Sequence, residues 1–555
     1  MKSNIKNIVL LATAAVFVLA GCTKDFEKIN TDPYGIADSE VSLGDLFNEA
    51  QLSVYYNQSN GNWEYQLIQN LNADLWSGYF AIPTGYNGGI NNDNYYMMDG
   101  WNGYTLNYML LHVIKPTCQV LKVEDLADDL KGIALILKVA GAHKMVDTYG
   151  PAPYSEAMQG GISVKYDSEE ESYTKMLDEL KEATTALTNW LNANGGDNAN
   201  RLSWDKMCGK SQTRWLQLGN TLRLRLAMRL AVVKPALAKE HAEAACANTY
   251  GLLKDADVEV KDGNTRNPLG IILRDYNDCA ISANYETILK GYNDPRLEKT
   301  AIGVGWNDKG DIKGPDGVTD TGWKGKIKGI RNGLKVDGTF YKTYSIMVMP
   351  LSGGPWSTDM PLPIMSRAEA SFLQAEGKLR GWNTGAGTVQ SYYEEGIKLS
   401  FGKYDLDDQY ADYIAGTTTQ IDYEDPHNPN NNIAAVNHLP VKFLAGGSNE
   451  EKLEQIITQK WIACFPEGLN AWAEYRRTGY PHLFPIPDDN CNVQTQYLKG
   501  TKADLIKYGA RRLPFATGER NANPAGLATG IKILTDRGQA DAIDCRLWWD
   551  TGRNF

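Results

Sequence analysis

The stretch from Glu169 to Leu191 reads EEESYTKMLDELKEATTALTNWL. Its apolar residues recur every three or four positions, which predicts an amphipathic helix with one buried face. A second helical pattern, Leu130–Tyr149, precedes it and stops at Gly150 and Pro151, residues that end helices. The two segments therefore predict an antiparallel helix pair. The residues of the apolar stripe are Tyr173, Met176, Leu177, Leu180, Leu187 and Leu191.

A second predicted pair consists of Ser366–Arg380 and Val389–Phe401. Small residues such as Gly377 on the first helix face Tyr393 and Gly396 on the second, which resembles a tetratricopeptide repeat without a strict period. Stacked helix pairs allow a long chain to fold without one oversized core. Further helices are predicted at roughly Trp101–Leu121, Arg214–Val233 and Glu450–Phe465.

Long segments rich in Gly, Asn and Pro separate these helical blocks. Irregular stretches of such length are uncommon inside compact domains and usually serve a function. We therefore expect a mostly α-helical protein whose ligand binds among the loops. The irregular segments are about 77–100, 255–362, 404–448 and 484–545.

The N-terminus has the pattern of a secretory signal. Lys2 and Lys6 precede the apolar run Ile8–Ala20, which is shorter than the roughly 20 residues that a membrane span needs. The run ends in Leu-Ala-Gly-Cys22, which resembles the bacterial lipobox. We expect residues 1–21 to be removed and Cys22 to be acylated; an ordinary signal peptide that ends near a cysteine is the alternative.

Charge and cysteine content exclude several classes of protein. The formal charge is −11, and removal of Lys2 and Lys6 with the signal takes it to −13, which argues against nucleic acid as a partner. Seven cysteines remain after Cys22, an odd number without a C-x-x-C spacing, so neither a disulfide framework nor a metal cluster is expected. We expect these thiols to be small buried side chains; they are Cys118, Cys208, Cys246, Cys279, Cys464, Cys491 and Cys545.

Catalytic and metal-binding motifs are missing from the sequence. It has no G-x-S-x-G and no H-E-x-x-H, and Trp204 stands where a P-loop before Gly209 requires glycine. No cofactor is expected. Calcium is a minor alternative to solvated acidic loops, because two acidic groups lie in loops without the spacing of an EF-hand. They are Asp308, Asp311, Asp316 and Asp320, and Asp422, Glu424 and Asp425.

The aromatic content favours a binding function. The chain has 30 Tyr and 14 Trp but 12 Phe, and Tyr and Trp combine a flat apolar face with a polar edge. Sugars present apolar faces rimmed by hydroxyls, so rings among Asn, Asp and Arg in the loops are candidate contacts. Packing against the helices is the alternative for each ring, above all for Trp76 and Trp101. The candidates are Tyr86, Tyr96, Trp101, Trp306, Trp323 and Tyr344.

Blocks spread in order over nearly the whole chain resemble the SusD/RagB family of outer-membrane nutrient-binding lipoproteins, and more narrowly its SusD-like subgroup. Cys22 is followed by DFEKINTDP at 25–33. The later blocks are DTYGPAPYSEA at 147–157, NTLRLRLAMR at 220–229, DPR at 294–296, ITQKWIA at 457–463 and AWAEYRRTGYP at 471–481.

This resemblance implies one SusD-like domain over residues 22–555. Its fold would be mostly α, with about four tetratricopeptide-like helix pairs forming a right-handed superhelical shelf, and a loop-rich half that binds the ligand. It also implies display on the outer-membrane surface, anchored in the bilayer through acylated Cys22. The partner would be a TonB-dependent β-barrel transporter of the SusC type, over which the protein would sit as a lid.

The residues of these blocks look structural. Arg223, Arg225 and Arg229 lie on one helix, and because buried arginines need carboxylate partners we expect ion pairs with acids such as Glu474 or Asp147. The segment from 149 to 154 holds a glycine and two prolines, so we expect it to form the turn that connects one helix of a pair to the next.

The function we expect is capture of glycans or oligosaccharides without catalysis. The same architecture binding oligopeptides is the alternative: backbone-pairing loop edges would favour peptide, and exposed stacked rings would favour sugar. A surface glycoside hydrolase would need two carboxylates facing each other across a cleft, which sequence does not reveal. A structural scaffold would need an apolar groove on the helical shelf.

Overall fold

The computed structural model describes residues 41–56, 62–160, 163–260, 267–304, 325–337, 343–347 and 361–555. The chain divides into two compact units, Met1–Leu46 and Phe47–Phe555. In the first unit, residues 41–46 hold the start of α3 (Leu43–Tyr56), where the Ser42 hydroxyl accepts the backbone N–H of Asp45 at 3.2 Å. The second unit contains the other described elements.

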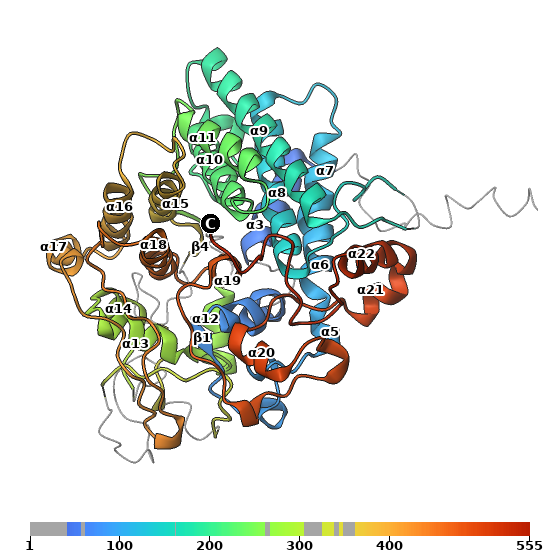
Figure 1. Cartoon of the computed structure of the whole chain (residues 1–555). Coiled ribbons are helices and arrows are strands. Elements are labelled where there is room, and N and C mark those ends of the chain that lie inside the picture. Colours follow the sequence, from blue (N-terminus) through green and yellow to red (C-terminus); the bar gives the residue numbers. More distant parts are fainter. Residues whose placement is uncertain are drawn as a thin grey trace, which may run out of the picture. The chain divides into compact units, whose positions relative to one another are not determined.

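Helices packed in succession build one half of Phe47–Phe555. The helix α8 (Asp128–Tyr149) packs on α9 (Glu169–Asn194), α9 packs on α10 (Gln212–Arg229), and α10 packs on α11 (Pro235–Ala247). These helices lie together at the top of Figure 1. The predicted pair formed by α8 and α9 is confirmed.

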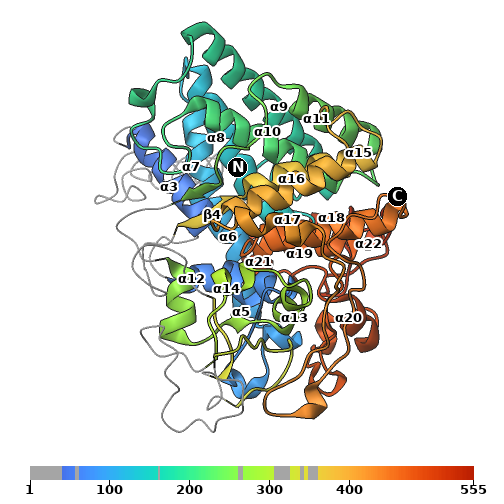
Figure 2. The same cartoon turned by 90° about the vertical axis from the view of Figure 1, so that its left-hand side faces the viewer.

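The second predicted pair is also confirmed. The helix α15 (Arg367–Leu379) packs on α16 (Val389–Gly402), and both contact α18 (Asn449–Ala463). Figure 2 shows α15, α16, α18 and α19 (Gly468–Thr478) crossing the middle of the unit, below α8–α11. The fold is mostly helical with tetratricopeptide-like architecture.

Local sequence signals start and stop α9. The Ser168 hydroxyl accepts the backbone N–H of Glu171, while the Glu171 carboxylate accepts the backbone N–H of Ser168, which forms a capping box. Gly195 ends the helix in the left-handed conformation, with φ 71°.

A sharp turn after α8 connects it to α9. Gly150 has φ 82°, and a Cβ at this position would lie 2.8 Å from the Glu169 carboxylate, so glycine is required for both reasons. Just beyond, Tyr154 donates a hydrogen bond to Glu179, which also pairs with Lys138 at 2.7 Å. The prediction that this segment connects the two helices of a pair is confirmed.

Buried ion pairs join the helix pairs at the centre. Arg229 on α10 pairs with Glu474 on α19 and lies 3.9 Å from Asp147 on α8, as predicted. Arg225 also finds carboxylates, but they are Glu369 at 2.9 Å and Glu467 at 3.0 Å. These contacts bring α8, α10, α15 and α19 together.

The prediction is wrong for the third arginine. Arg223 donates from Nε to Nδ1 of His241 at 2.9 Å, and the structure gives it no carboxylate partner within the described residues. His143 is a core histidine, as its apolar surroundings suggest: it is buried, and its Nδ1 lies 3.4 Å from Asp147. Burial lowers the pKa of His143, against the opposing effect of Asp147.

The predicted helix Trp101–Leu121 is broken into shorter pieces. They are α5 (Asp99–Asn102), α6 (Tyr104–Met109), the π-helical turn η5 (Leu110–Ile114) and α7 (Lys115–Leu121). Pro116 in the first turn of α7 has no N–H to donate, which suits a new helix start.

Short elements and loops build the other half, below the helices in Figure 2. Two small antiparallel sheets hold distant segments together: β1 (Phe80–Ala81) pairs with β3 (Ala280–Ile281), and β2 (Val258–Val260) pairs with β4 (Leu362–Met365). The helices below in Figure 2 include α12 (Pro268–Ile271), α13 (Ala283–Gly291), α14 (Arg296–Thr300) and α20 (Lys502–Tyr508), and the remaining described helices are α4 (Asn62–Tyr65), α17 (Tyr410–Ile414), α21 (Thr517–Ala522) and α22 (Pro524–Asp536).

π- and 3₁₀-helical turns complete the described elements. The π-helix η2 (Gln66–Asp74) continues α4 and is buried throughout. The other turns are η3 (Tyr86–Gly89), η4 (Asn92–Asn94), η6 (Ala199–Leu202), η7 (Ile272–Tyr276), η9 (Asp407–Gln409), η10 (Pro429–Asn431), η11 (Asp488–Asn490) and η12 (Thr495–Tyr497).

Most of the described cysteine side chains are buried, as predicted. Every cysteine that the structure describes is free, and all are buried except Cys118 and Cys246, which are half-buried. Among the described helices, none is both long and apolar enough to cross a membrane.

Candidate functional site

The loop between β1 and α5 carries two of the predicted ligand contacts, Tyr86 and Tyr96, and a third, Trp101, follows within α5. At the start of η4, the Asn94 side chain accepts the backbone N–H of Asn91 at 3.0 Å, and the Asn91 side chain accepts the backbone N–H of Asp93 at 3.1 Å. Tyr95 then adopts φ 64° although it is buried, a conformation that costs energy for a bulky residue. The loop is therefore held in one shape by its own side chains.

Asp93 ties this loop to a segment far along the chain. Its carboxylate accepts hydrogen bonds from the Asn332 side-chain amide at 2.7 Å and from the Gly333 backbone N–H at 3.1 Å. Burial raises the pKa of Asp93 to about 6, against the opposing effect of these hydrogen bonds. The loop before Trp101 thus contacts the segment at 332–333.

Two of the predicted rings form a pair at this loop. The ring centres of Tyr86 and Trp101 lie 6.5 Å apart at an angle of 49°, and both side chains are half-buried. The Tyr86 hydroxyl has no hydrogen-bond partner among the described residues. Burial and the nearby Asp278 and Asp93 carboxylates raise the pKa of Tyr86, so its hydroxyl stays protonated and can donate.

A polar group lies beside this pair. Asp278 accepts a hydrogen bond of 2.9 Å from the Gln66 side chain, and Thr84 donates to it at 3.5 Å. Burial raises the pKa of Asp278. Gln66 is the first residue of η2, and π-helical turns often occur at functional sites. A carboxylate, an amide and a hydroxyl beside flat rings can bind sugar hydroxyls.

A second ring pair extends the site, and the sequence analysis missed it. Trp63 on α4 meets Tyr104 edge to face, with ring centres 5.3 Å apart, and Trp63 is 42% exposed. Tyr104 is the first residue of α6 and follows the end of α5, which carries Trp101, by two residues. We call Tyr86, Trp101, Tyr104 and Trp63 the aromatic strip.

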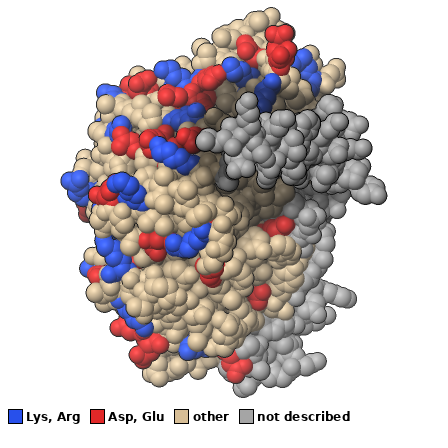
Figure 3. Space-filling model, turned by 90° about the vertical axis from the view of Figure 1, so that its right-hand side faces the viewer, with Lys and Arg blue, Asp and Glu red and all other residues tan. Residues whose placement is uncertain are grey.

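Charged side chains are unevenly spread over one face of the protein. Figure 3 shows many Lys, Arg, Asp and Glu side chains over its upper, helical part and fewer over the lower part.

Comparison with known proteins identifies the family of this chain. A family model for the SusD and RagB outer membrane lipoproteins matches residues 28–550. The chain belongs to this SusD-like family. No protein among the curated sequences matches it.

Solved structures of SusD homologues share the fold of this SusD-like protein. A chitin-binding SusD homologue from Flavobacterium johnsoniae is 37% identical, with a TM-score of 0.80, over 92% of this chain and 100% of that one. A SusD homologue from Bacteroides vulgatus is 29% identical, also with a TM-score of 0.80, over 92% and 98%. One from Bacteroides uniformis is 29% identical, with a TM-score of 0.78, over 92% and 99%.

The remaining predicted contacts are not gathered at the aromatic strip. Tyr96 is half-buried, directly after the strained Tyr95. Tyr344 is 3% exposed; its hydroxyl lies 3.4 Å from Asp425, and its ring meets His427 edge to face. Trp306 and Trp323 lie outside the described residues.

Other predicted residues are structural or cannot be placed. Trp76 is buried and donates from Nε1 to the Asn92 carbonyl at 3.0 Å, so it supports the loop. In the second acidic group, Asp425 is buried and accepts the backbone N–H of His427 at 2.8 Å, while Asp422 and Glu424 are exposed. The first acidic group, at 308–320, and Cys22 lie outside the described residues.

Proposed function

We propose that this SusD-like protein captures glycans on the cell surface, with the aromatic strip as its binding platform. The Tyr86–Trp101 pair carries the proposal, because its half-exposed rings stand on a loop held by Asp93. Sugar rings stack on the flat faces of Tyr and Trp side chains. A preorganised site loses little conformational entropy when the ligand binds. The likeness to a chitin-binding homologue at 37% identity supports a glycan ligand.

The mechanism is binding without chemistry. One sugar ring lies against Tyr86 and Trp101, and its hydroxyls meet the Asp278 carboxylate. Further units of a longer chain reach Tyr104 and Trp63. The protein, anchored through acylated Cys22, then passes the glycan to a TonB-dependent β-barrel transporter of the SusC type in the same outer membrane.

A binding screen tests this proposal. Soluble residues 23–555 are run by affinity electrophoresis through gels that contain one polysaccharide each, and a parallel calorimetric titration uses mixed oligopeptides. We expect retardation by at least one polysaccharide and no release of reducing sugar. Heat with peptides and no retardation would move the function to peptide uptake, and release of reducing sugar would make the protein a hydrolase.

A further inference from the structure

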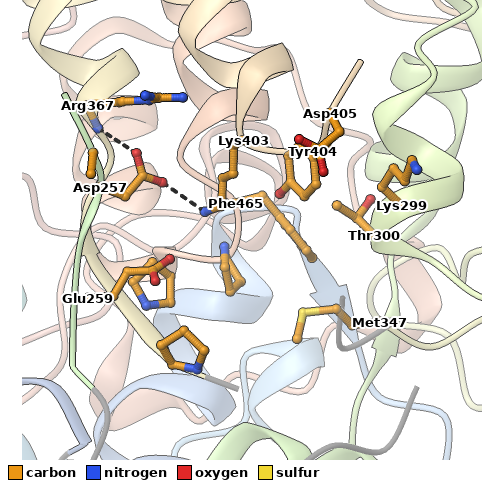
Figure 4. Close-up of a pocket in the computed structure, with 14 residues that line it drawn as sticks. Asp257, Glu259, Lys299, Thr300, Met347, Arg367, Lys403, Tyr404, Asp405 and Phe465 are labelled. Carbon is orange, nitrogen blue, oxygen red and sulfur yellow. Dashed lines mark hydrogen bonds and ion pairs between the residues drawn. The ribbon is translucent and has the colours of Figure 1, made fainter. Parts of the chain in front are cut away.

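A separate cavity of about 440 Å³ lies between β2, α14 and α15, within the size range of small-molecule sites. Figure 4 shows charged side chains around it and Phe465 and Met347 facing its interior. None of the aromatic strip residues lines it.

Most of the charges around this cavity are balanced. Lys403 lies 3.1 Å from the Asp257 carboxylate, which also accepts the Arg367 backbone N–H at 2.9 Å. Asp405 and Lys299, of opposite charge, are both exposed to solvent on the side of the cavity opposite β2 (Figure 4).

Glu259 is the exception. It is the middle residue of β2, whose neighbours Val258 and Val260 are buried on the other face of the strand. Its carboxylate faces the cavity, and no described residue gives it a hydrogen bond or an ion pair. Burial raises the pKa of Glu259, against the opposing effect of Lys403. A partly buried carboxylate without a partner is costly, and a bound cation would remove that cost.

We propose that this cavity binds a small molecule that carries a protonated amine on an apolar body. The amine pairs with Glu259, and the body lies against Phe465 and Met347. An amine has three donors in a compact charge, which a carboxylate accepts well. This site does not depend on the glycan proposal, since it shares no residue with the aromatic strip.

The test uses 2-phenylethylamine as the probe and 2-phenylethanol as its uncharged match. Both are titrated calorimetrically into residues 23–555, which include every residue that the structure describes. We expect the amine to bind at least tenfold more tightly than the alcohol. Equal binding of the two, or binding of neither, would overturn the proposal without any variant.

Three variants locate the site. Glu259→Gln keeps the shape of the side chain and removes its charge, so it should weaken amine binding tenfold or more. Asp405→Asn, on the opposite side of the cavity, should change it less than twofold. Tyr86→Ala with Trp101→Ala should leave it unchanged, with all melting temperatures measured as a check on folding. Unchanged amine binding in Glu259→Gln, or its loss with the ring variants, would contradict the assignment.

Discussion

The Asp93 carboxylate accepts a hydrogen bond of 2.7 Å from the side-chain amide of Asn332, 239 residues further along the chain. The same Asn332 amide donates to the Phe80 carbonyl at 2.8 Å. One buried amide thus joins β1, the aromatic loop and the segment at 332–333. The position of Tyr86 depends on this junction, because the loop that carries it begins and ends there.

Asp93→Ala should damage both stability and binding. It removes one of the acceptors of the Asn332 amide and leaves the Gly333 N–H without its acceptor, and an unsatisfied buried group costs about 1–3 kcal/mol. We expect a loss of that order in urea unfolding and weaker retention by the glycan. Glu424→Gln, at an exposed position, is the control and should change neither. Normal affinity in Asp93→Ala would show that the junction does not position the rings.

Asp93 should also make stability depend on pH. Its pKa rises from 3.8 to about 6 on folding, so between these values the folded protein holds a proton that the unfolded chain lacks. The unfolding free energy contributed by Asp93 therefore falls as pH rises from about 4 to 6. At 1.36 kcal/mol per pKa unit, the change is at most roughly 3 kcal/mol. Urea unfolding of wild type and Asp93→Ala at pH 5 and 7.5 measures it; an equal difference at both pH values would refute it.

The Trp63→Ala variant tests how far a bound oligosaccharide extends along the aromatic strip. Trp63 lies at its exposed end, so short oligosaccharides that fill only the Tyr86–Trp101 pair should bind as before. Longer ones should lose affinity by roughly three- to tenfold, or ~0.7–1.4 kcal/mol. Calorimetry with oligosaccharides of increasing length measures this. Equal losses at every length would mean that Trp63 acts on the fold rather than as a distant subsite.

The helices could be predicted, since their signal is local. Glu169–Leu191 carries its apolar stripe within one segment, and the structure extends that helix only to Asn194. The break of Trp101–Leu121 was missed because the apolar spacing hardly changes where the helix widens into η5. Short helices in the irregular segments, such as α20, have too few turns to show a period.

The site was predicted only in part. Loop composition singled out Tyr86 and Trp101, but not which of the candidate rings meet. The Asp93–Asn332 contact joins positions too far apart in sequence for any pattern to indicate it. Trp63 stands alone between helical segments, and its pairing with Tyr104 is likewise a product of the tertiary fold.

Glu376→Gln should lower the free energy of unfolding of the helical half. Both Glu376 oxygens accept hydrogen bonds of 2.7 Å from Arg477, which joins α15 to α19. Removing one partner of such a buried pair costs about 3–5 kcal/mol. Denaturant unfolding measures the loss. Asp536→Asn, in the exposed pair with Lys532, is the control and should have little effect.

The same variant has a defined pH dependence. Although burial opposes it, Arg477 and Arg380 hold the pKa of Glu376 well below its ordinary 4.5. The stability that it contributes is therefore present above about pH 4.5 and is lost as pH falls toward the folded pKa. A difference between wild type and variant that grew on acidification would contradict this assignment.

The most direct test of the central claim is a calorimetric titration of the retained glycan into Tyr86→Ala/Trp101→Ala. The matched control is Tyr250→Ala, an aromatic residue of the helical half that bonds Asn192 at 3.0 Å. If the aromatic strip is the glycan platform, the double variant should lose at least about tenfold in affinity, ~1.4 kcal/mol, with an unchanged melting temperature, and the control should bind like wild type. Wild-type affinity in the folded double variant would contradict the account.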